Sequence, residues 1–555
     1  MKLRSVTVIL AMVFCGIAQA RDIVRDAEYY ILEAQHGERW AAQDEALDEE
    51  LAAFRERNGG KPPNIFYILI DDIGFGDLGS ETLNAIRGYD TPGINEIARE
   101  GMRLARMYTE PSCTPTRVAF MTGRQPYRNG MGNTSVDISG FGLAGKEVTL
   151  AEVLSEVGYN TVHIGKWHMG DIKEAWPNHQ GFDFAAFPIH QQGQLTIFHD
   201  DAADEEVSIG IGDNNYDGRF TLDGWLRTDS STMVTGVEGD RGKKVREVHM
   251  EPGERWNEAK YHEMNVRYQN QAMEHLRKLA AQDEPFFLQY WPLYPLTGPR
   301  TTTDEYTTPN GGIYVEKMKL VDQWIGELMA EMDALGIAEN TLVIVMGDNG
   351  HFTKYSPQSG YTPMVFRGGK GSTSEGGVRV DAFVRWPGMI EPDSVVGDMV
   401  HVTDLFMTIA RLGGAVEEIP TDRIIDGIDQ TALLLDGETN GRRDYVFLYN
   451  INALEAVVKE QYKLAIPGGK IDNAILADFY DLFRDPQERY PVSTEIGAWG
   501  GAKFVRMLQR HLQRKMEYPD EGPATGIPYD GVENLRPESK EAVEQFLFMM
   551  KSPKM

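Results

Sequence analysis

Oxygen-bearing side chains stand directly after two apolar, β-rich runs of the sequence. Asp71 and Asp72 follow the run 64–70. Asp348 and Asn349 follow a second such run, separated from it by one glycine. Ligands of open parallel sheets gather beyond the carboxyl ends of the strands, and carboxylate and amide oxygens suit a hard divalent cation such as Ca²⁺ or Mg²⁺. Each pair alone is as compatible with a turn or a helix cap, but their paired occurrence favours a cation site.

The second candidate for a chemical role is a cysteine. The chain has two cysteines, Cys15 and Cys113. Pro115 suits the first turn of a helix, so Cys113 is expected at a helix N-terminus, where backbone N–H groups and the helix dipole favour anions. Arg117 lies four residues on and projects from the same face. Both a reactive centre and a small buried thiol fit this pattern.

The stretch 113–124 carries a longer and more specific pattern. C-x-P-x-R followed by T-G-R resembles the signature of the type I sulfatases, which belong to the alkaline phosphatase superfamily. In that family, a formylglycine-generating enzyme oxidises the cysteine to 3-oxoalanine (formylglycine), whose hydrated aldehyde is the nucleophile. The resemblance therefore implies an arylsulfatase-like enzyme that hydrolyses a sulfate ester with a formylglycine made from Cys113.

The resemblance covers most of the chain. It includes the first strand with its carboxylates, a G-K-W-H motif, a D-N-G segment, a G-G-K-G…E-G-G-x-R stretch and parts of a C-terminal subdomain. The matching segments are 64–80, 165–170, 347–350, 368–379, 462–464 and 480–486. The last ~60 residues have no equivalent in the family pattern that we can assign.

The family's metal ligands carry over onto side chains that the strand-end pattern also indicates. The resemblance implies one Ca²⁺ per chain, with Mg²⁺ as an alternative of the same ligand chemistry. One oxygen comes from the modified cysteine or from the sulfate. The implied ligand positions are Asp71, Asp72, Cys113, Asp348 and Asn349.

The resemblance also assigns roles to basic side chains. Lys166 and Lys370 would hold sulfate oxygens. Arg117 would orient and polarise the formylglycine, and His168 would act as a base on one of its hydroxyls. The implied reaction has two stages: a hydroxyl of the hydrated aldehyde attacks sulfur and the alcohol or phenol leaves, and the sulfated hemiacetal then expels sulfate. Covalent catalysis of this kind splits one difficult step into two.

One family feature is missing from this chain. Many sulfatases carry a His that helps to protonate the leaving group, in the segment equivalent to 292–297. Here Tyr294 or Leu296 takes its place. A tyrosine can donate a proton, although a place in the pocket wall is the plainer alternative. His190 and His351 are the other candidates, and we predict that His190 and Tyr294 contact the substrate.

The arrangement of predicted elements indicates an α/β fold. Strands and helices alternate up to about residue 440, and short strands joined by turns follow, which predicts a large, mostly parallel sheet sandwiched by helices and a smaller C-terminal α+β subdomain with a short antiparallel sheet. Predicted helices include 27–57, 148–157, 261–281, 314–335 and 502–516, and predicted strands include 64–70, 160–164, 285–291, 341–346, 445–449, 456–458 and 462–466. The expected divisions are a signal peptide (1–20), an N-terminal helical extension (21–60), a catalytic domain (61–440) and a C-terminal subdomain with its tail (441–555).

Charge and the N-terminal pattern narrow the class of protein. The net charge of −29 argues against nucleic-acid binding and requires local cations or a metal for an anionic substrate. Residues 1–20 combine a basic start, an apolar run and a small-x-small end, which is typical of a secretory signal. We therefore expect an exported, periplasmic protein with neither a membrane span nor a lipid anchor, because Phe14 precedes Cys15 where a lipoprotein has a small residue.

Two other functions remain open from the sequence. A phosphodiesterase or phosphonate monoester hydrolase can use the same scaffold, because fold does not determine function. A non-catalytic binding protein could also retain the scaffold. The sequence does not distinguish an aryl sulfate from a sulfated carbohydrate as substrate, and it indicates no oligomeric state.

Overall fold

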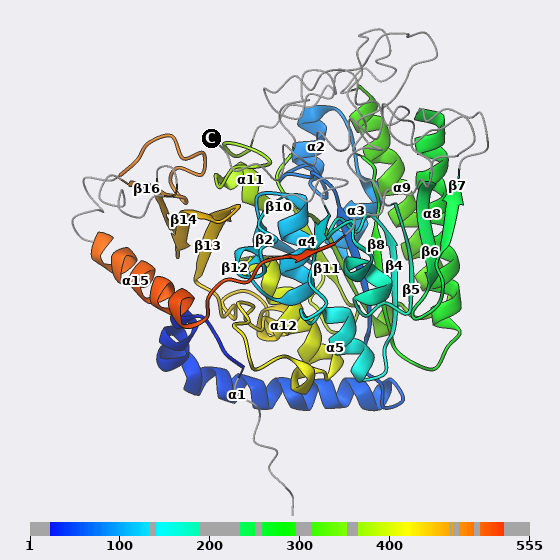
Figure 1. Cartoon of the computed structure of the whole chain (residues 1–555), viewed down its shortest axis with the longest axis horizontal. Helices are drawn as coiled ribbons and strands as arrows, with labels where there is room; N and C mark the ends of the chain where they lie inside the picture. The colour runs from blue at the N-terminus through cyan, green and yellow to red at the C-terminus, as the bar shows by residue number, and fades with distance from the viewer. Residues whose placement is uncertain are drawn as a thin grey trace, which may run out of the picture.

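A large mixed β-sheet with helices on both faces forms the centre of the molecule (Figure 1). A four-stranded antiparallel sheet and a two-stranded one are separate from it. In this computed structural model, the described part of the 555-residue chain comprises residues 23–133, 140–188, 234–249, 258–295, 312–351, 365–466, 469, 477–492 and 500–526.

The central sheet has the strand order β10-β2-β11-β9-β1-β8-β4-β5-β6-β7, with β12 paired to β2. Its middle section, β9-β1-β8-β4-β5, is parallel, which confirms the predicted α/β class. Antiparallel strands extend both sides of this section, so the complete sheet is mixed. The strands are β1 (Asn64–Ile70), β2 (Met102–Tyr108), β4 (Asn160–Gly165), β5 (Phe184–Phe187), β6 (Val234–Asp240), β7 (Arg246–His249), β8 (Phe286–Trp291), β9 (Thr341–Gly347), β10 (Arg379–Val380), β11 (Ala382–Arg385) and β12 (Ser394–His401).

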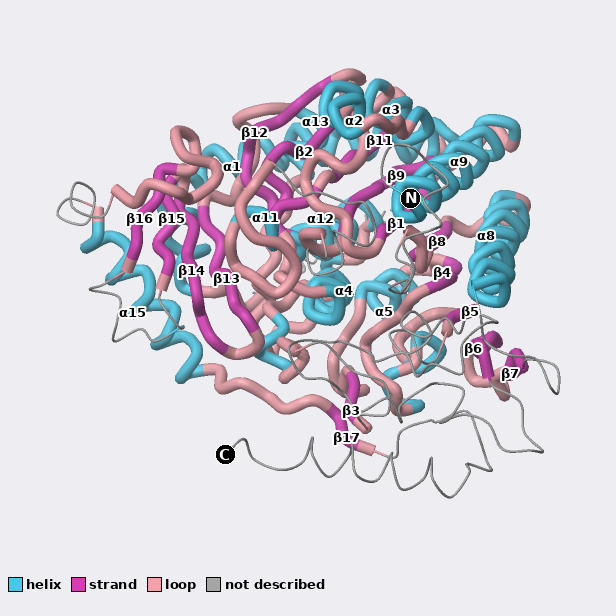
Figure 2. The backbone as a smooth tube through the Cα atoms, turned by 90° about the horizontal axis from the view of Figure 1, so that it is seen from above, coloured by secondary structure: helices cyan, strands magenta, loops and turns pink. Residues whose placement is uncertain are grey.

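Strand β1 explains why the sheet needs helices on both sides. Its side chains alternate between two apolar clusters, with Ile65 and Tyr67 in one and Phe66 and Ile68 in the other. All of them are fully buried, and burying one such side chain stabilises the fold by about 1.5–3 kcal/mol. Helices α4, α5 and α12 cover one face, and α3, α8 and α9 cover the other (Figure 2).

The helices follow the predicted pattern closely. Helix α1 spans the predicted range 27–57 and lies along the lower edge in Figure 1. The carboxylate of Asp26 caps it by accepting a hydrogen bond from the backbone N–H of Glu28. The longer helices and those near the site are α1 (Ala27–Arg57), α2 (Glu81–Arg87), α3 (Pro92–Arg99), α4 (Cys113–Thr122), α5 (Leu150–Glu156), α8 (Glu258–Ala280), α9 (Gly312–Ala334), α11 (Glu375–Val378), α12 (Val402–Gly413), α13 (Thr431–Asp436) and α15 (Gly501–Glu517).

The predicted C-terminal antiparallel sheet is present and lies to one side of the central sheet, with α15 beside it (Figure 2). Its strands pair in sequence order, as expected when turns join them. They are β13 (Tyr445–Asn450), β14 (Ala453–Lys459), β15 (Tyr462–Ala465) and β16 (Asp478–Asp481); β3 (Phe141–Gly142) and β17 (Ala524–Thr525) form the two-stranded sheet. The proposed domain boundaries at 60 and 440 stay predictions.

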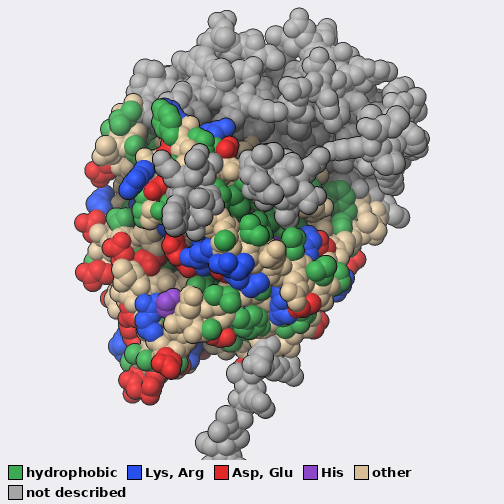
Figure 3. Space-filling model, turned by 90° about the vertical axis from the view of Figure 1, so that its left-hand side faces the viewer, with side chains coloured by type: hydrophobic (Ala, Val, Ile, Leu, Met, Phe, Trp, Pro, Cys, Tyr) green, Lys and Arg blue, Asp and Glu red, His purple; other side chains and the backbone are tan. Residues whose placement is uncertain are grey.

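Basic side chains gather locally in spite of the acidic composition. Figure 3 shows a group of Lys and Arg side chains across the middle of the face that is on the left in Figure 1. Helix α15 lies on this side and carries Lys503, Arg506, Arg510, Arg514 and Lys515.

Within the described ranges, no helix combines the length and apolar character that crossing a membrane requires.

Candidate active site

The carboxyl ends of β1 and β9 bring the strand-end oxygens together. The two strands are parallel neighbours. The backbone N–H of Asp72 donates to Oδ1 of Asp348 over 2.9 Å, and the N–H of Asp348 donates to the carbonyl of Ile70 over 3.0 Å. The Nδ2 of Asn349 donates to Oδ1 of Asp72 over 2.8 Å. The predicted convergence of these side chains is therefore observed in the geometry.

Cys113 begins α4, as Pro115 led us to expect, and its thiol lies among these carboxylates. Candidate ligand atoms of Asp71, Asp72, Cys113 and Asp348 all lie within 4.8 Å of one another, and the four side chains are buried. The cluster therefore has the size and the donor types of a metal site.

Arg117 occupies the next turn of α4 and is fully buried. Its Nη2 donates to Asp71 Oδ1 over 3.1 Å and to Asp348 Oδ2 over 2.8 Å. Its Nη1 donates to the carbonyl of Lys166 over 2.9 Å, and its Cζ lies 4.8 Å from the ring centroid of Trp291. The guanidinium is thus held on three sides, and it links β1, β9 and the end of β4.

Two lysines reach the cluster from different segments. Lys166 follows β4 directly, and its Nζ donates to Asp71 Oδ1 over 2.7 Å. Lys370 comes from the Gly-rich loop: its Nζ lies 2.7 Å from Asp72 Oδ1 and 2.9 Å from Cys113 Sγ. Lys370 therefore lies within reach of an anion placed at Cys113, and Lys166 contacts a carboxylate of the same cluster.

Burial and the charges of neighbouring groups change the pKa values of the clustered carboxylates. Burial and the neighbouring Asp71 carboxylate raise the pKa of Asp348 to about 8. For Asp71, burial acts to raise the pKa, but the charges of Lys166, Lys370 and Arg117 outweigh it and hold the pKa well below its usual value. Without an added cation, the two acids therefore share their negative charge unevenly.

Burial also determines the state of two candidate reactive groups. It raises the pKa of the Cys113 thiol well above its usual value, and Asp71 adds to the effect. Burial lowers the pKa of His168 well below its usual value, and the charges of Lys166 and Arg117 lower it further. The thiol is therefore protonated and the imidazole is neutral at ordinary pH.

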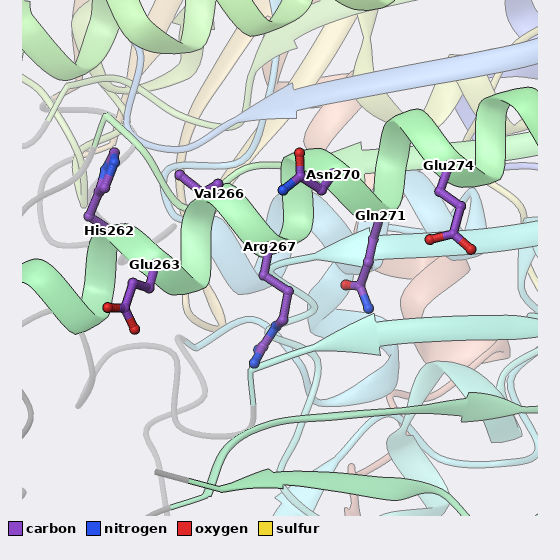
Figure 4. A pocket seen from close by; sticks show the side chains of 7 residues that line it. All are labelled: His262, Glu263, Val266, Arg267, Asn270, Gln271 and Glu274. Carbon is purple, nitrogen blue, oxygen red and sulfur yellow. The ribbon is translucent and has the colours of Figure 1, made fainter. Parts of the chain in front are cut away.

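The candidate leaving-group acids that the structure describes lie in different surroundings. Tyr294 is fully buried, and its hydroxyl lies 3.3 Å from Nδ1 of His262 on α8. Figure 4 shows His262 at one end of a row of side chains that line a groove of about 470 Å³ along α8. His351 is buried, and its carbonyl accepts the N–H of Lys370 over 3.0 Å. His190 and Leu296 lie outside the described residues, and a proton-donating role for Tyr294 stays a prediction.

One site residue escaped the sequence analysis. Trp291 is the last residue of β8, which lies between β1 and β4 in the sheet, and its ring centroid lies 4.8 Å from Cζ of Arg117. A Cβ on Gly165, whose φ is +105°, would lie 2.1 Å from the Trp291 carbonyl. Trp291 ends a parallel strand, and Asp71 was identified because it follows the end of one. An aromatic residue at such a position is, however, ordinarily part of the hydrophobic core.

Comparisons with known proteins agree with this geometry. The sequence profile of the sulfatase family matches residues 63–415. Rat (Rattus norvegicus) steryl-sulfatase is 30% identical over 507 residues, covering 79% of this chain and 86% of that protein. Mouse (Mus musculus) N-acetylgalactosamine-6-sulfatase is 29% identical over 491 residues, covering 81% and 86%.

A solved structure extends the agreement to three dimensions. The PsFucS1 sulfatase from Pseudoalteromonas sp. superimposes with a TM-score of 0.71 at 27% identity, covering 87% of this chain and 96% of that one. Residues 63–415, which the family profile matches, contain every side chain of the cluster around Cys113. The chain therefore belongs to the sulfatase family and is a sulfuric ester hydrolase.

Proposed function

We propose that this sulfatase hydrolyses its sulfate ester with a formylglycine made from Cys113 and one Ca²⁺ held by Asp71, Asp72, Asp348, Asn349 and the modified residue 113. The observation that carries the proposal is the convergence of these side chains from three separate segments. Candidate ligand atoms of Asp71, Asp72, Cys113 and Asp348 lie within 4.8 Å of one another in a buried cluster, and Nδ2 of Asn349 lies 2.8 Å from Oδ1 of Asp72.

The donor atoms fit a bound cation. Oδ2 of Asp71 and Oδ1 of Asn349 are buried and have no hydrogen-bond partner, which costs free energy unless a ligand satisfies them. The raised pKa of Asp348 reflects its burial first and then repulsion from Asp71, and a divalent cation would relieve that repulsion. When bound, the ion supplies a Lewis acid that polarises a sulfuryl oxygen. Ca²⁺ suits this set better than Mg²⁺, which usually keeps several waters.

The state of the thiol supports conversion of Cys113. Its raised pKa keeps the unmodified side chain protonated, and a protonated thiol is a poor nucleophile. Formylglycine at this position supplies a hydrated aldehyde whose hydroxyl is the nucleophile. A formylglycine-generating enzyme is the maturation partner that the C-x-P-x-R sequence implies.

The basic side chains act on charge and orientation. Lys370 lies 2.9 Å from the Cys113 sulfur and Lys166 lies 2.7 Å from Asp71, so both can hold sulfuryl oxygens as negative charge develops there. Arg117 is fixed by Asp71 and Asp348 and lies one turn along α4 from residue 113, where its charge can orient the modified side chain. His168 is neutral and can accept a proton from a hydroxyl of the modified residue.

The proposed substrate is a small-molecule or carbohydrate sulfate ester. The names of the two relatives, steryl-sulfatase and N-acetylgalactosamine-6-sulfatase, cover both classes. Export to the periplasm, with residues 1–20 as a cleaved signal, completes the proposal and rests on their basic, apolar and small-residue pattern.

A comparison of leaving-group-matched esters tests the proposal. We expect purified enzyme to hydrolyse 4-nitrophenyl sulfate with a higher kcat/KM than 4-nitrophenyl phosphate or bis(4-nitrophenyl) phosphate. Cys113→Ser should abolish release of sulfate, because an unoxidised serine has one hydroxyl and its sulfate ester cannot expel sulfate by forming an aldehyde. Faster turnover of the phosphate diester would favour a phosphodiesterase instead.

A further inference from the structure

Lys463, a buried lysine of the C-terminal sheet, lies between the carboxylates of Glu375 and Glu488. Lys463 belongs to β15, and its side chain is 1% exposed. Its Nζ lies 3.1 Å from Oε1 of Glu375 and 2.8 Å from Oε1 of Glu488. Glu375 begins α11, and Glu488 follows β16. Lys463 therefore joins the C-terminal sheet to α11 through buried charges.

The carboxylates hold α11 from two sides. Oε2 of Glu488 accepts the backbone N–H of Glu375 over 2.7 Å. Oε2 of Glu375 accepts the hydroxyl of Tyr108 over 2.9 Å and lies 3.4 Å from Nη1 of Arg379. Two buried anions thus face two cations, and removing one cation leaves an uncompensated buried charge, which is strongly unfavourable.

Helix α11 contacts both loops of the proposed site. The N–H of Gly350, the residue after Asn349, donates to the carbonyl of Gly377 over 2.9 Å. The N–H of Gly376 donates to the carbonyl of Arg367 over 2.7 Å. A Cβ on Gly350 would lie 1.8 Å from the Gly376 carbonyl, so the backbones pack without free space. A shift of α11 must therefore displace the segment that holds Asn349.

A second set of contacts ties the C-terminal part to the Lys370 loop. Nη1 of Arg367 donates to the carbonyl of Glu488 over 2.9 Å, and Nε2 of Gln487 donates to the carbonyl of Val365 over 3.1 Å. Arg367 precedes Lys370 by three residues. The segment that supplies Glu488 to Lys463 therefore also holds the start of this loop.

We propose that Lys463 is a positioning residue of the sulfatase site. Through Glu375 and Glu488 it fixes α11, and α11 fixes the placement of Lys370 and Asn349. This inference rests on the proposed function, because it assumes that Lys370 holds sulfate and that Asn349 binds the metal. The C-terminal sheet is then part of the catalytic apparatus and not an appended unit.

A matched control exists one strand away. Lys459 of β14 is also buried between two carboxylates, with Nζ 3.0 Å from Glu28 Oε1 and 2.7 Å from Asp444 Oδ1. Its partner Glu28 belongs to α1 and not to the site loops. Lys459→Met therefore imposes the same chemical change as Lys463→Met, in the same sheet, without the link to α11.

The test compares full-length, formylglycine-containing Lys463→Met, Lys463→Arg and Lys459→Met with the unmutated enzyme. We expect Lys463→Met to lower kcat/KM for 4-nitrophenyl sulfate about 10–100-fold, the usual effect of removing a residue that orients a metal site. Amide hydrogen exchange in 365–378 and at Gly350 should become faster. Lys463→Arg should restore most of the activity, and Lys459→Met should lower the unfolding temperature without changing either readout.

Unchanged exchange in these segments for Lys463→Met, or faster exchange with an unchanged kcat/KM, overturns the proposal. If Lys463→Met does not fold, Glu488→Gln takes its place and the same two readouts decide. Hydrogen exchange does not require turnover. Failure of the unmutated enzyme to hydrolyse sulfate esters would therefore count against the proposed function and would be distinguishable from failure of this inference.

Discussion

Chelation of the bound metal should lower the apparent unfolding temperature, and Asn349→Leu should remove most of this dependence. Oδ1 of Asn349 and Oδ2 of Asp71 are buried without a hydrogen-bond partner. Each unsatisfied atom costs about 1–3 kcal/mol, so the metal-free site carries a penalty of about 2–6 kcal/mol. Metal binding recovers part of this free energy, and leucine at position 349 removes one of the oxygens that the metal satisfies.

The size of the effect follows from mass action. Free Ca²⁺ at one hundred times its dissociation constant stabilises the folded protein by about 2.7 kcal/mol. One kcal/mol shifts Tm by about 2–4 °C in a domain of 150–250 residues and by less in a larger one. For this chain we expect a rise of about 3–5 °C between chelator and saturating Ca²⁺.

Differential scanning fluorimetry at one fixed scan rate measures this shift, with Mg²⁺ as a parallel titrant. Asn84→Leu is the matched control. Asn84 is equally buried, but its Nδ2 donates to the carbonyl of Asp77 and its Oδ1 accepts the N–H of Ser80. Asn84→Leu should lower Tm and keep the Ca²⁺-dependent rise. A Ca²⁺ response that is absent from the unmutated enzyme, or undiminished in Asn349→Leu, would refute the proposed metal site.

Three further outcomes are expected. Lys370→Met should reduce kcat/KM for 4-nitrophenyl sulfate about 10²–10³-fold, as for loss of one charge-stabilising donor, and weaken inhibition by inorganic sulfate; a loss below tenfold contradicts its role. Burial raises the pKa of Asp322 from 3.8 to about 6, so the folded state holds this proton more tightly and stability falls as pH rises from about 4 to about 6. The free energy of unfolding of Asp322→Asn should therefore rise by up to about 3 kcal/mol relative to that of the unmutated protein between pH 4 and pH 7. Denaturant unfolding measures this difference, and a difference that does not depend on pH is the contrary result. Tyr294→Phe should leave turnover of 4-nitrophenyl sulfate unchanged because this phenol leaves without protonation, and a selective slowing of alkyl sulfates would identify Tyr294 as the acid.

The elements with strong local patterns could be predicted from the sequence. The helix 27–57 and the strand 64–70 have the predicted bounds. Other predicted elements, such as the helix 148–157 that runs from Leu150 to Glu156, differ by a few residues at their ends, where capping and not periodicity decides the limit. The carboxylates that follow the strands could be predicted to lie close together because parallel strands end at the same edge of the sheet.

The antiparallel parts of the central sheet could not be predicted in the same way. Strands β10 and β11 span Arg379–Val380 and Ala382–Arg385, and runs this short carry little periodicity. Their place beside β2 is determined by long-range pairing, which is invisible in local patterns. The same limit applies to Lys463, whose partner Glu375 is 88 residues away.

Mass spectrometry of the peptide that contains residue 113, taken from enzyme preparations of graded activity, tests whether formylglycine is the nucleophile. We expect the specific activity toward 4-nitrophenyl sulfate to rise in proportion to the fraction of residue 113 present as 3-oxoalanine and to extrapolate to zero without it. Full activity in a preparation whose Cys113 is an unmodified thiol would rule out a formylglycine nucleophile.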